Sequence, residues 1–290
     1  MKYLIITPVR DEENTIEITI KSVLNQSILP AKWLIIDDNS TDNTPKIIEK
    51  YSLNYSFIKS LSIDDQRKRI PGKGPMSIFN YGIKTIELNQ YDFIVKLDAD
   101  MEFKNKYFET IFLEFSKDSK LGIASGLIIE KNTLKPSKKH YHEITQGPTK
   151  VYKQKCFIEI MPNEEFKGWD FLDNIKAMKN GYKTKIINNL RAIHLKPMDQ
   201  SVGYQKENYL KGYYDAHLKF SILFVFVKFL KKMLLEKPLF LNGYYYFYGY
   251  CKNLFIDKEF YKDKKIISFI KVHHYRRLKE MIMFKRNLYY

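Results

Sequence analysis

The stretch FIVKLDAD, residues 93–100, is an apolar run that ends in two carboxylates one residue apart. The run is continuous rather than alternating, which predicts a strand over 91–97 that is buried on both faces of a sheet. Asp98 and Asp100 then lie just past its carboxyl end. Two carboxylates at this spacing can both reach one divalent cation, although a solvated strand end with a helix-capping aspartate has the same pattern.

The sequence on both sides of this stretch alternates between strand and helix patterns. Apolar runs at residues 2–9, 32–37 and 121–130 predict further strands. Together with the strand over 91–97, these strands are separated along the chain by helical patterns. Continuous apolar strands that alternate with helices predict an α/β fold, with a mainly parallel sheet covered by helices on both faces. In such sheets, ligands bind beyond the carboxyl ends of the strands.

Polar clusters follow two more of the predicted strands. TPVRDEEN (7–14) follows the first, and Asp37-Asp38-Asn39-Ser40 follows the second. A turn with a helix N-cap would explain the Asn and Ser of the second cluster, but not its adjacent carboxylates. Such a carboxylate could accept hydrogen bonds from a nucleotide base or a ribose hydroxyl. Three polar clusters at one sheet edge predict a ligand site there.

The ordered set of these segments resembles the family 2 glycosyltransferases, which have a GT-A fold: a Rossmann-like, mixed and mainly parallel sheet flanked by helices. The resemblance covers roughly residues 2–195. It implies an inverting enzyme that moves one sugar from a nucleotide-diphosphate sugar to an acceptor, with UDP as the expected nucleotide. The matching segments are TPVRDEEN, WLIIDDNSTDNT (33–44), GPMSIFNYG (74–82), FIVKLDAD, QGPTKVYKQKCFIEI (146–160) and FKGWDFLDNIKAMKNGYKT (166–184).

The resemblance also implies roles for single residues on the donor side. Asp100 would bind Mn²⁺ or Mg²⁺ directly, and Asp98 would lie near the ribose and the metal. His194, in RAIHL (191–195), would complete the metal site, although a lone histidine is more often structural. The residues implied to contact the nucleotide are Thr7, Pro8, Arg10 and Glu12 in the first loop, Asp38 at the base or ribose, and, by a looser match, Lys73 near the base or diphosphate.

On the acceptor side, Asp170 matches the family's catalytic base. The family usually has Glu-Asp at this point, whereas this chain has Trp169-Asp170, so the second acid is kept. Trp169 could instead stack on an acceptor sugar, because flat aromatic faces suit sugar C–H surfaces. Position alone would favour another role for Asp170, as an acid at a helix N-terminus. Processive synthases of the family carry a Gln-x-x-Arg-Trp motif and membrane spans; the chain shows neither, which predicts addition of a single sugar.

Composition divides the chain near residue 218. The 290 residues carry 49 Lys plus Arg against 33 Asp plus Glu, a net charge of +16, and residues 219–290 alone account for +11. We therefore expect a catalytic domain over 1–217 and a basic, aromatic-rich, helical extension over 218–290. The two cysteines, Cys156 and Cys251, cannot form a disulfide framework, so we expect a cytoplasmic protein, with a peripheral position on the inner membrane face as an option.

The extension begins with an amphipathic pattern. Apolar residues recur at helical spacing between Phe220 and Leu235, with Lys228, Lys231 and Lys232 among them. This pattern predicts either an interfacial helix on an anionic membrane surface or a helix that packs on the catalytic domain with solvated lysines. The run GYYYFYGY (243–250) could line an acceptor cleft, pack the domain or touch lipid.

Other functions compete with sugar transfer. A nucleotidyltransferase on a similar sheet usually has a Gly-rich phosphate loop after its first strand, and TPVRDEEN contains no glycine. A nucleic-acid-binding protein would present a basic face, but the expected site is acidic, so we expect no nucleic-acid partner. An inactive scaffold or a basic membrane-binding protein is a further alternative. The preferred function is transfer to a glycan or lipid-linked acceptor in cell-surface polysaccharide synthesis.

Overall fold

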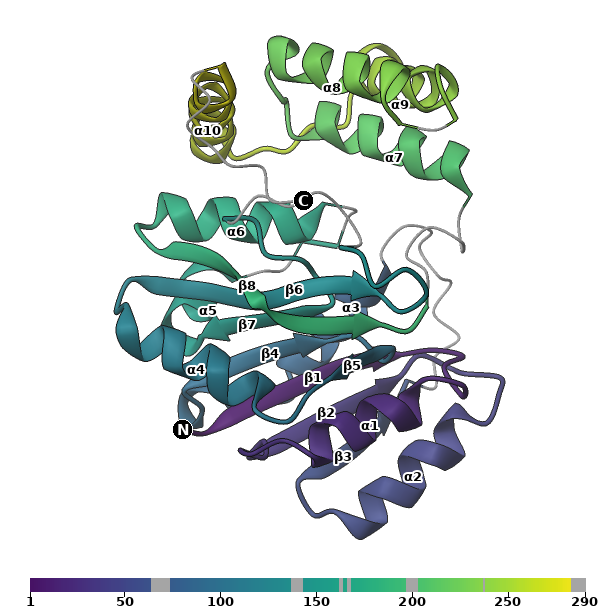
Figure 1. Cartoon of the computed structure of the whole chain (residues 1–290), viewed down its shortest axis with the longest axis vertical. Coiled ribbons are helices and arrows are strands. Elements are labelled where there is room, and N and C mark those ends of the chain that lie inside the picture. Colours follow the sequence, from purple (N-terminus) through teal and green to yellow (C-terminus); the bar gives the residue numbers. More distant parts are fainter. Residues whose placement is uncertain are drawn as a thin grey trace. The chain divides into compact units, whose positions relative to one another are not determined.

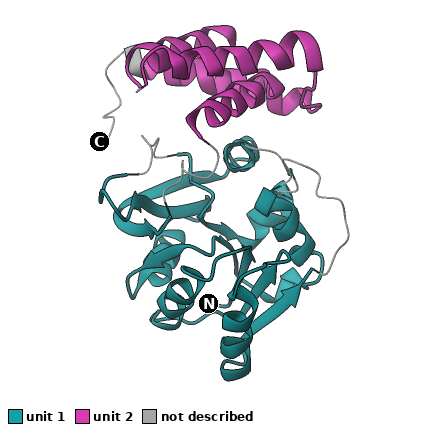
Figure 2. Ribbon diagram, turned by 90° about the vertical axis from the view of Figure 1, so that its right-hand side faces the viewer, with its two compact units in different colours: residues 1–197, 290 teal, residues 198–289 magenta. Residues whose placement is uncertain are grey.

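The chain forms two compact units, residues 1–197 and Met198–Tyr289, which are coloured separately in Figure 2. The computed structural model describes residues 1–63, 74–136, 143–161, 164–165, 168–196, 203–236 and 238–282. The boundary between the two units, after residue 197, lies before the composition shift near residue 218, because helix α7 (Tyr204–His217) belongs to the second unit. The helical extension predicted at the C-terminal end is present.

The first unit contains a mixed, mainly parallel sheet with the order β3-β2-β1-β4-β7-β6-β8-β5 (Figure 1). Strands β3, β2, β1 and β4 run parallel to one another, whereas β7 and β5 are antiparallel to their neighbours. This confirms the fold class expected from the sequence. The strands are β1 (Tyr3–Val9), β2 (Lys32–Asp37), β3 (Ile58–Ser62), β4 (Phe93–Leu97), β5 (Met101–Phe103), β6 (Leu121–Glu130), β7 (Thr149–Lys153) and β8 (Lys183–His194).

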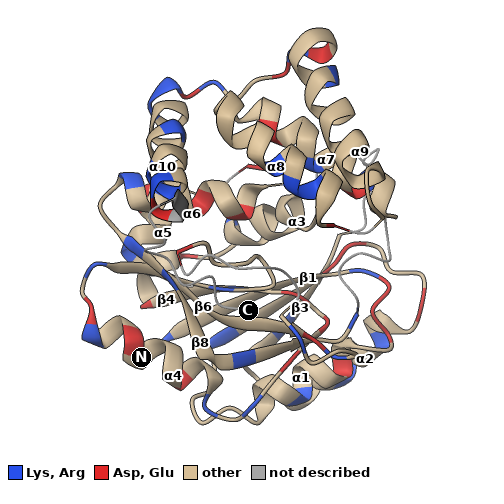
Figure 3. Ribbon diagram, turned by 45° about the horizontal axis from the view of Figure 1, so that its top comes forward, with Lys and Arg blue, Asp and Glu red and all other residues tan. Residues whose placement is uncertain are grey.

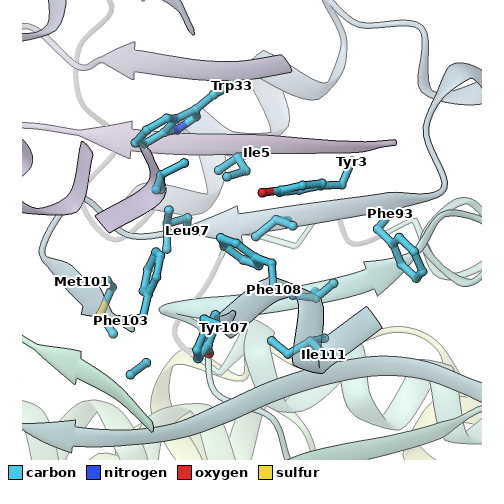
Figure 4. Close-up of a cluster of buried hydrophobic side chains, with 14 of the residues drawn as sticks. Tyr3, Ile5, Trp33, Phe93, Leu97, Met101, Phe103, Tyr107, Phe108 and Ile111 are labelled. Carbon is cyan, nitrogen blue, oxygen red and sulfur yellow. The ribbon is translucent and has the colours of Figure 1, made fainter. Parts of the chain in front are cut away.

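Helices cover both faces of this sheet. One face packs against α1 (Ile16–Leu24), α2 (Thr44–Asn54) and α4 (Tyr107–Lys117). The other packs against α3 (Gly74–Ile83), α5 (Gln154–Ile160) and α6 (Trp169–Lys179), with a short 3-10 helix at Leu88–Gln90 near that layer. Strand β1 serves both cores, because alternate side chains point to opposite faces. Tyr3 and Ile5 enter the first core, drawn in Figure 4, and Leu4 and Ile6 enter the second.

The register of the parallel strands places the three polar clusters at one edge. Val9 pairs with Asp37, and Ile6 pairs with Lys96. Counting forward from these pairs, the chain leaves β1, β2 and β4 at nearly the same level. The residues after the three strands therefore meet at the carboxyl edge of the sheet, as the sequence predicts.

The second unit is helical. Besides α7 it contains α8 (Ile222–Leu234), α9 (Leu241–Cys251), a π-helical turn (Lys252–Asp257) and α10 (Lys264–Ile282). Helices α7 and α9 approach closely at two glycines: a Cβ on Gly212 would lie 1.8 Å from the Tyr246 carbonyl oxygen, and one on Gly249 would lie 2.0 Å from that of Tyr209. Across the described residues of both units, helices with the length and apolar character needed to cross a bilayer are absent.

Candidate active site

The loops after β1 and β2 are tied together at the sheet edge. The Asp38 amide donates to the Val9 carbonyl oxygen at 2.9 Å. Arg10 Nη1 donates to the Asp38 carbonyl oxygen at 3.3 Å and lies 3.7 Å from the Asp38 carboxylate. Burial raises the pKa of Asp38, and the opposing effect of Arg10 does not cancel this shift. The edge thus holds a partly shielded carboxylate that could accept hydrogen bonds from a base or ribose.

The other residues expected in the nucleotide loop have partners within the protein. Thr7 is fully buried, and its hydroxyl accepts a hydrogen bond from Trp33 Nε1 at 2.9 Å. Pro8 is buried within β1. Glu12 contacts the Thr15 hydroxyl and lies 2.7 Å from Lys196 Nζ. Nucleotide contact by these residues stays a prediction, and Lys73 lies outside the described residues.

Asp100 and His194 meet although they are far apart in the sequence. Strand β5 pairs with β8 so that Met101 lies opposite His194, and the Leu195 amide donates to the Asp100 carbonyl oxygen at 2.9 Å. This brings His194 Nε2 to 3.1 Å from Asp100 Oδ2, while Glu130 lies 3.8 Å from the other ring nitrogen. Burial opposes a charge on His194, but the hydrogen bond and negative charge of Asp100 outweigh it and raise the pKa of His194.

The side chains of Asp100 and His194 are of the kinds that can bind a divalent metal together with a substrate. Within the described ranges, no three His, Cys, Asp or Glu side chains converge to hold a metal by themselves. A divalent ion bound by one or two protein side chains completes its shell with substrate phosphates and water. A carboxylate with an imidazole suits Mn²⁺, whereas Mg²⁺ prefers oxygen ligands. Asp100 and His194 therefore fit a divalent metal that a nucleotide diphosphate would share.

Asp98 lies close to this pair but has a different neighbour. Its carboxylate contacts the ammonium of Lys96, a buried residue of β4. Its amide donates to the Pro148 carbonyl oxygen at 2.9 Å, which fixes the chain as it leaves β4. The contact with Lys96 compensates one negative charge at the edge. Roles for Asp98 at the ribose and the metal stay predictions.

Asp170 lies in the first turn of α6, on the side of the edge near Asp98. Gly147, next to Pro148, connects the two segments: a Cβ there would lie 2.9 Å from the Trp169 ring and 3.8 Å from Asp170 Cβ. The Asp170 carbonyl oxygen accepts from Lys150 Nζ and from Asn174 Nδ2, both at 2.6 Å. Its carboxylate makes no hydrogen bond to the part of the chain that the structure describes. The turn is thus fixed through its backbone, and the carboxylate itself can accept a proton.

Sequence reasoning missed a buried polar network behind this turn. Lys150 on β7 is fully buried, and its Nζ lies 3.5 Å from Asp173 Oδ2 on α6. The Tyr152 hydroxyl donates to the same oxygen at 2.6 Å. Burial lowers the pKa of Lys150 and raises the pKa of Asp173 to about 6. FIVKL (93–97) offers a signal, a lysine inside an otherwise apolar run, whereas TKVYK (149–153) contains two lysines and does not single out Lys150.

The ring of Trp169 lies near both buried lysines, Lys96 and Lys150. Lys96 Nζ is 5.3 Å from the centroid of the Trp169 ring and Lys150 Nζ is 5.1 Å from it. Both cations thus lie within the range of a cation–π contact. The side chain is half-buried. The ring therefore has a structural role, and acceptor stacking by Trp169 stays a prediction.

The sheet, with acidic residues at the carboxyl ends of β1, β2 and β4, has the architecture of the GT-A glycosyltransferases. The model of the family "Glycosyl transferase family 2" matches residues 4–174. The chain belongs to this family, and its class, a glycosyltransferase, is the one expected from the sequence.

Curated relatives match part of the chain. Poly-beta-1,6-N-acetyl-D-glucosamine synthase of Staphylococcus aureus (strain MSSA476) is 34% identical over 116 residues, which are 40% of this chain and 26% of that protein. The Staphylococcus epidermidis protein of the same name is 30% identical over the same length and shares. The chain thus spans about a quarter of the length of these relatives.

Solved structures show the same fold over most of the chain. Residues 1–349 of Staphylococcus aureus TarS in complex with UDP-GlcNAc superpose with a TM-score of 0.58 at 20% identity, covering 88% of this chain and 76% of that one. The mannosyltransferase PcManGT from Pyrobaculum calidifontis, in complex with GDP-Man and Mn²⁺, gives 0.60 at 14% identity, covering 89% and 88%.

Proposed function

We propose that this protein is an inverting, metal-dependent glycosyltransferase that moves one sugar from a nucleotide-diphosphate sugar, UDP-linked by expectation, to a glycan or lipid-linked acceptor in cell-surface polysaccharide synthesis. The observation that carries the proposal is the Asp100–His194 pair beside the Arg10–Asp38 pair at one sheet edge. The names of the staphylococcal relatives support a surface polysaccharide as the product. Solved structures with UDP-GlcNAc, and with GDP-Man and Mn²⁺, support a nucleotide sugar and a metal.

Each group of site residues has its own role in the proposed reaction. Arg10 and Asp38 bind the base or ribose of the donor. Asp100 and His194 hold the divalent ion, which when bound stabilises negative charge on the departing diphosphate. Asp170 takes the proton from the acceptor hydroxyl as that oxygen attacks the anomeric carbon. The new C–O bond forms on the face opposite the breaking bond to the diphosphate oxygen, so the configuration inverts.

A panel of nucleotides tests the donor and the metal together. UDP with Mn²⁺ is expected to raise the melting temperature by several degrees, because a ligand that binds only the folded state stabilises it. GDP, dTDP and CDP are expected to give smaller shifts, and EDTA should remove the metal-dependent part. A larger shift with GDP than with UDP would reassign the donor. A flat response to every nucleotide with Mn²⁺ would contradict the donor site.

Single substitutions test the metal pair. Asp100→Ala and His194→Ala are each expected to weaken Mn²⁺ binding about 100-fold or more, because each substitution removes one of the two proposed protein ligands of the ion. Isothermal titration with Mn²⁺ and UDP measures this loss directly. His217→Ala, a histidine of the second unit, serves as the matched control. Unchanged Mn²⁺ affinity in Asp100→Ala would exclude that carboxylate as a ligand.

A further inference from the structure

Helix α8 turns an apolar side outward. Ile222, Phe226, Leu230 and Leu234 are exposed and repeat every four residues, so they form one stripe along the helix. Ile222 is 80% exposed. Leu223 lies within the same stripe, and the exposed Leu235 follows the end of the helix. A helix of this kind in water normally buries its apolar stripe.

Two of the three lysines of α8 point the other way, into the second unit. Lys228 contacts the carboxylate of Asp215 on α7, which also accepts from the Tyr246 hydroxyl of α9 at 2.6 Å. Lys232 is buried and donates to Asn208 Oδ1 of α7 at 2.7 Å. The interior between α7, α8 and α9 thus contains paired charges. This corrects the expectation that these two lysines are solvated or face lipid.

Helix α9 extends the apolar surface. The rings of Phe226 and Phe229 lie 6.4 Å apart, and Phe229 lies 5.2 Å from Phe247 on α9, so exposed apolar groups continue from one helix to the next. The turn between the helices adds Leu239 and Phe240. We call this surface the α8–α9 face; its exposed members are Ile222, Leu223, Phe226, Leu230, Leu234, Leu235, Leu239, Phe240, Leu241, Tyr244, Phe247 and Tyr248.

Charge favours one occupant for this face. Residues 219–290 carry a net charge of +11, and the charged residues of α10 are mainly Lys and Arg (blue ribbon in Figure 3). A second copy of the chain would bring the same positive charge against it, which opposes self-association. An anionic lipid surface has the opposite charge. Tyr244 and Tyr248 add amphipathic rings of the kind enriched at membrane interfaces.

We propose that the α8–α9 face inserts into the interfacial layer of a lipid bilayer that contains anionic lipids. The contact is mainly apolar, and the net positive charge of residues 219–290 strengthens it. Lys231, exposed on α8, can extend its ammonium to the headgroup level while its stem lies along the apolar surface. The face belongs to the second unit, so it can be tested separately from sugar transfer.

Flotation with vesicles measures the contact. The protein is expected to float with phosphatidylcholine vesicles, more strongly when phosphatidylglycerol is added, and to remain bound at high salt. The triple variant Leu223→Ser/Phe226→Ser/Leu230→Ser should bind about 100-fold more weakly, because three apolar groups are lost. The matched control is Leu29→Ser/Leu53→Ser/Leu113→Ser, which changes three exposed leucines of the first unit and should float like the wild type.

Three outcomes would overturn the proposal. The α8 variant could float like the wild type. Binding could need anionic lipid and vanish at high salt, which would indicate a charged patch alone. The wild type could ignore vesicles and form a dimer that the α8 variant dissolves, which would assign the face to a second copy.

A second variant tests insertion without removing an apolar group, so that a loss of protein stability does not explain its result. Phe226→Trp keeps an apolar side chain, and its emission is expected to shift to shorter wavelength and to be quenched by spin-labelled lipid. No shift and no quenching with either vesicle would contradict insertion. Stabilisation of each variant by UDP with Mn²⁺ reports on the first unit, so failure of donor binding is distinguishable from failure of membrane binding.

Discussion

Asp170→Asn is expected to lower kcat for sugar transfer by about 10²- to 10⁴-fold, the usual contribution of a general base. An amide has nearly the shape of the carboxylate but cannot take the acceptor proton. The backbone of the turn should keep its place, because Lys150 and Asn174 both donate to the carbonyl oxygen of residue 170 and not to its side chain.

The controls separate chemistry from binding and folding. UDP affinity and the melting temperature of Asp170→Asn should equal those of the wild type. Asp118→Asn, which removes an exposed carboxylate paired with Lys183, should leave kcat unchanged. Initial rates with saturating donor and acceptor give the comparison. Turnover of Asp170→Asn within a few-fold of the wild type would exclude Asp170 as the base.

The placement of the acidic residues at one sheet edge was predictable because its signals are local. Each of β1, β2 and β4 reads as a continuous apolar run followed by polar residues, and parallel strands put those residues at one edge. The residue pattern alone therefore suffices to place Asp38 and Asp100 at this edge. The strand over 32–37 coincides with β2, and that over 121–130 with β6.

The rest depends on contacts between distant segments. His194 reaches Asp100 because β8 lies between β6 and β5 and pairs with both. Residue patterns alone do not reveal such long-range pairing. Which side of α8 faces the interior of the second unit also depends on residues far away in the sequence. Its amphipathic pattern is plain in the sequence, but Asp215 and Asn208 on α7 decide that Lys228 and Lys232 point inward.

Lys150→Met is expected to reduce the free energy of unfolding by about 3–5 kcal/mol, the usual cost of removing one partner from a buried ion pair. Asp173 is 1% exposed, so its carboxylate would lose its nearest cation and could not be rehydrated. Beside Lys150 the pKa of Asp173 is about 6, so the wild-type carboxylate is mainly ionised well above that pH and pairs with the lysine there. Urea unfolding above pH 6, followed by fluorescence of Trp33 and Trp169 in the first unit, measures the change.

An exposed pair gives the contrast that makes this prediction decisive. Lys183 Nζ lies 2.7 Å from Asp118, closer than Lys150 lies to Asp173, yet Lys183→Met is expected to leave the free energy of unfolding nearly unchanged because water screens the pair. The double variant Lys150→Met/Asp173→Asn should recover part of the loss, since no buried charge is left unpaired. Equal costs for the two lysine substitutions would show that burial adds nothing to the Lys150 pair. A double variant less stable than Lys150→Met would instead assign the role of Asp173 to its hydrogen bond with Tyr152.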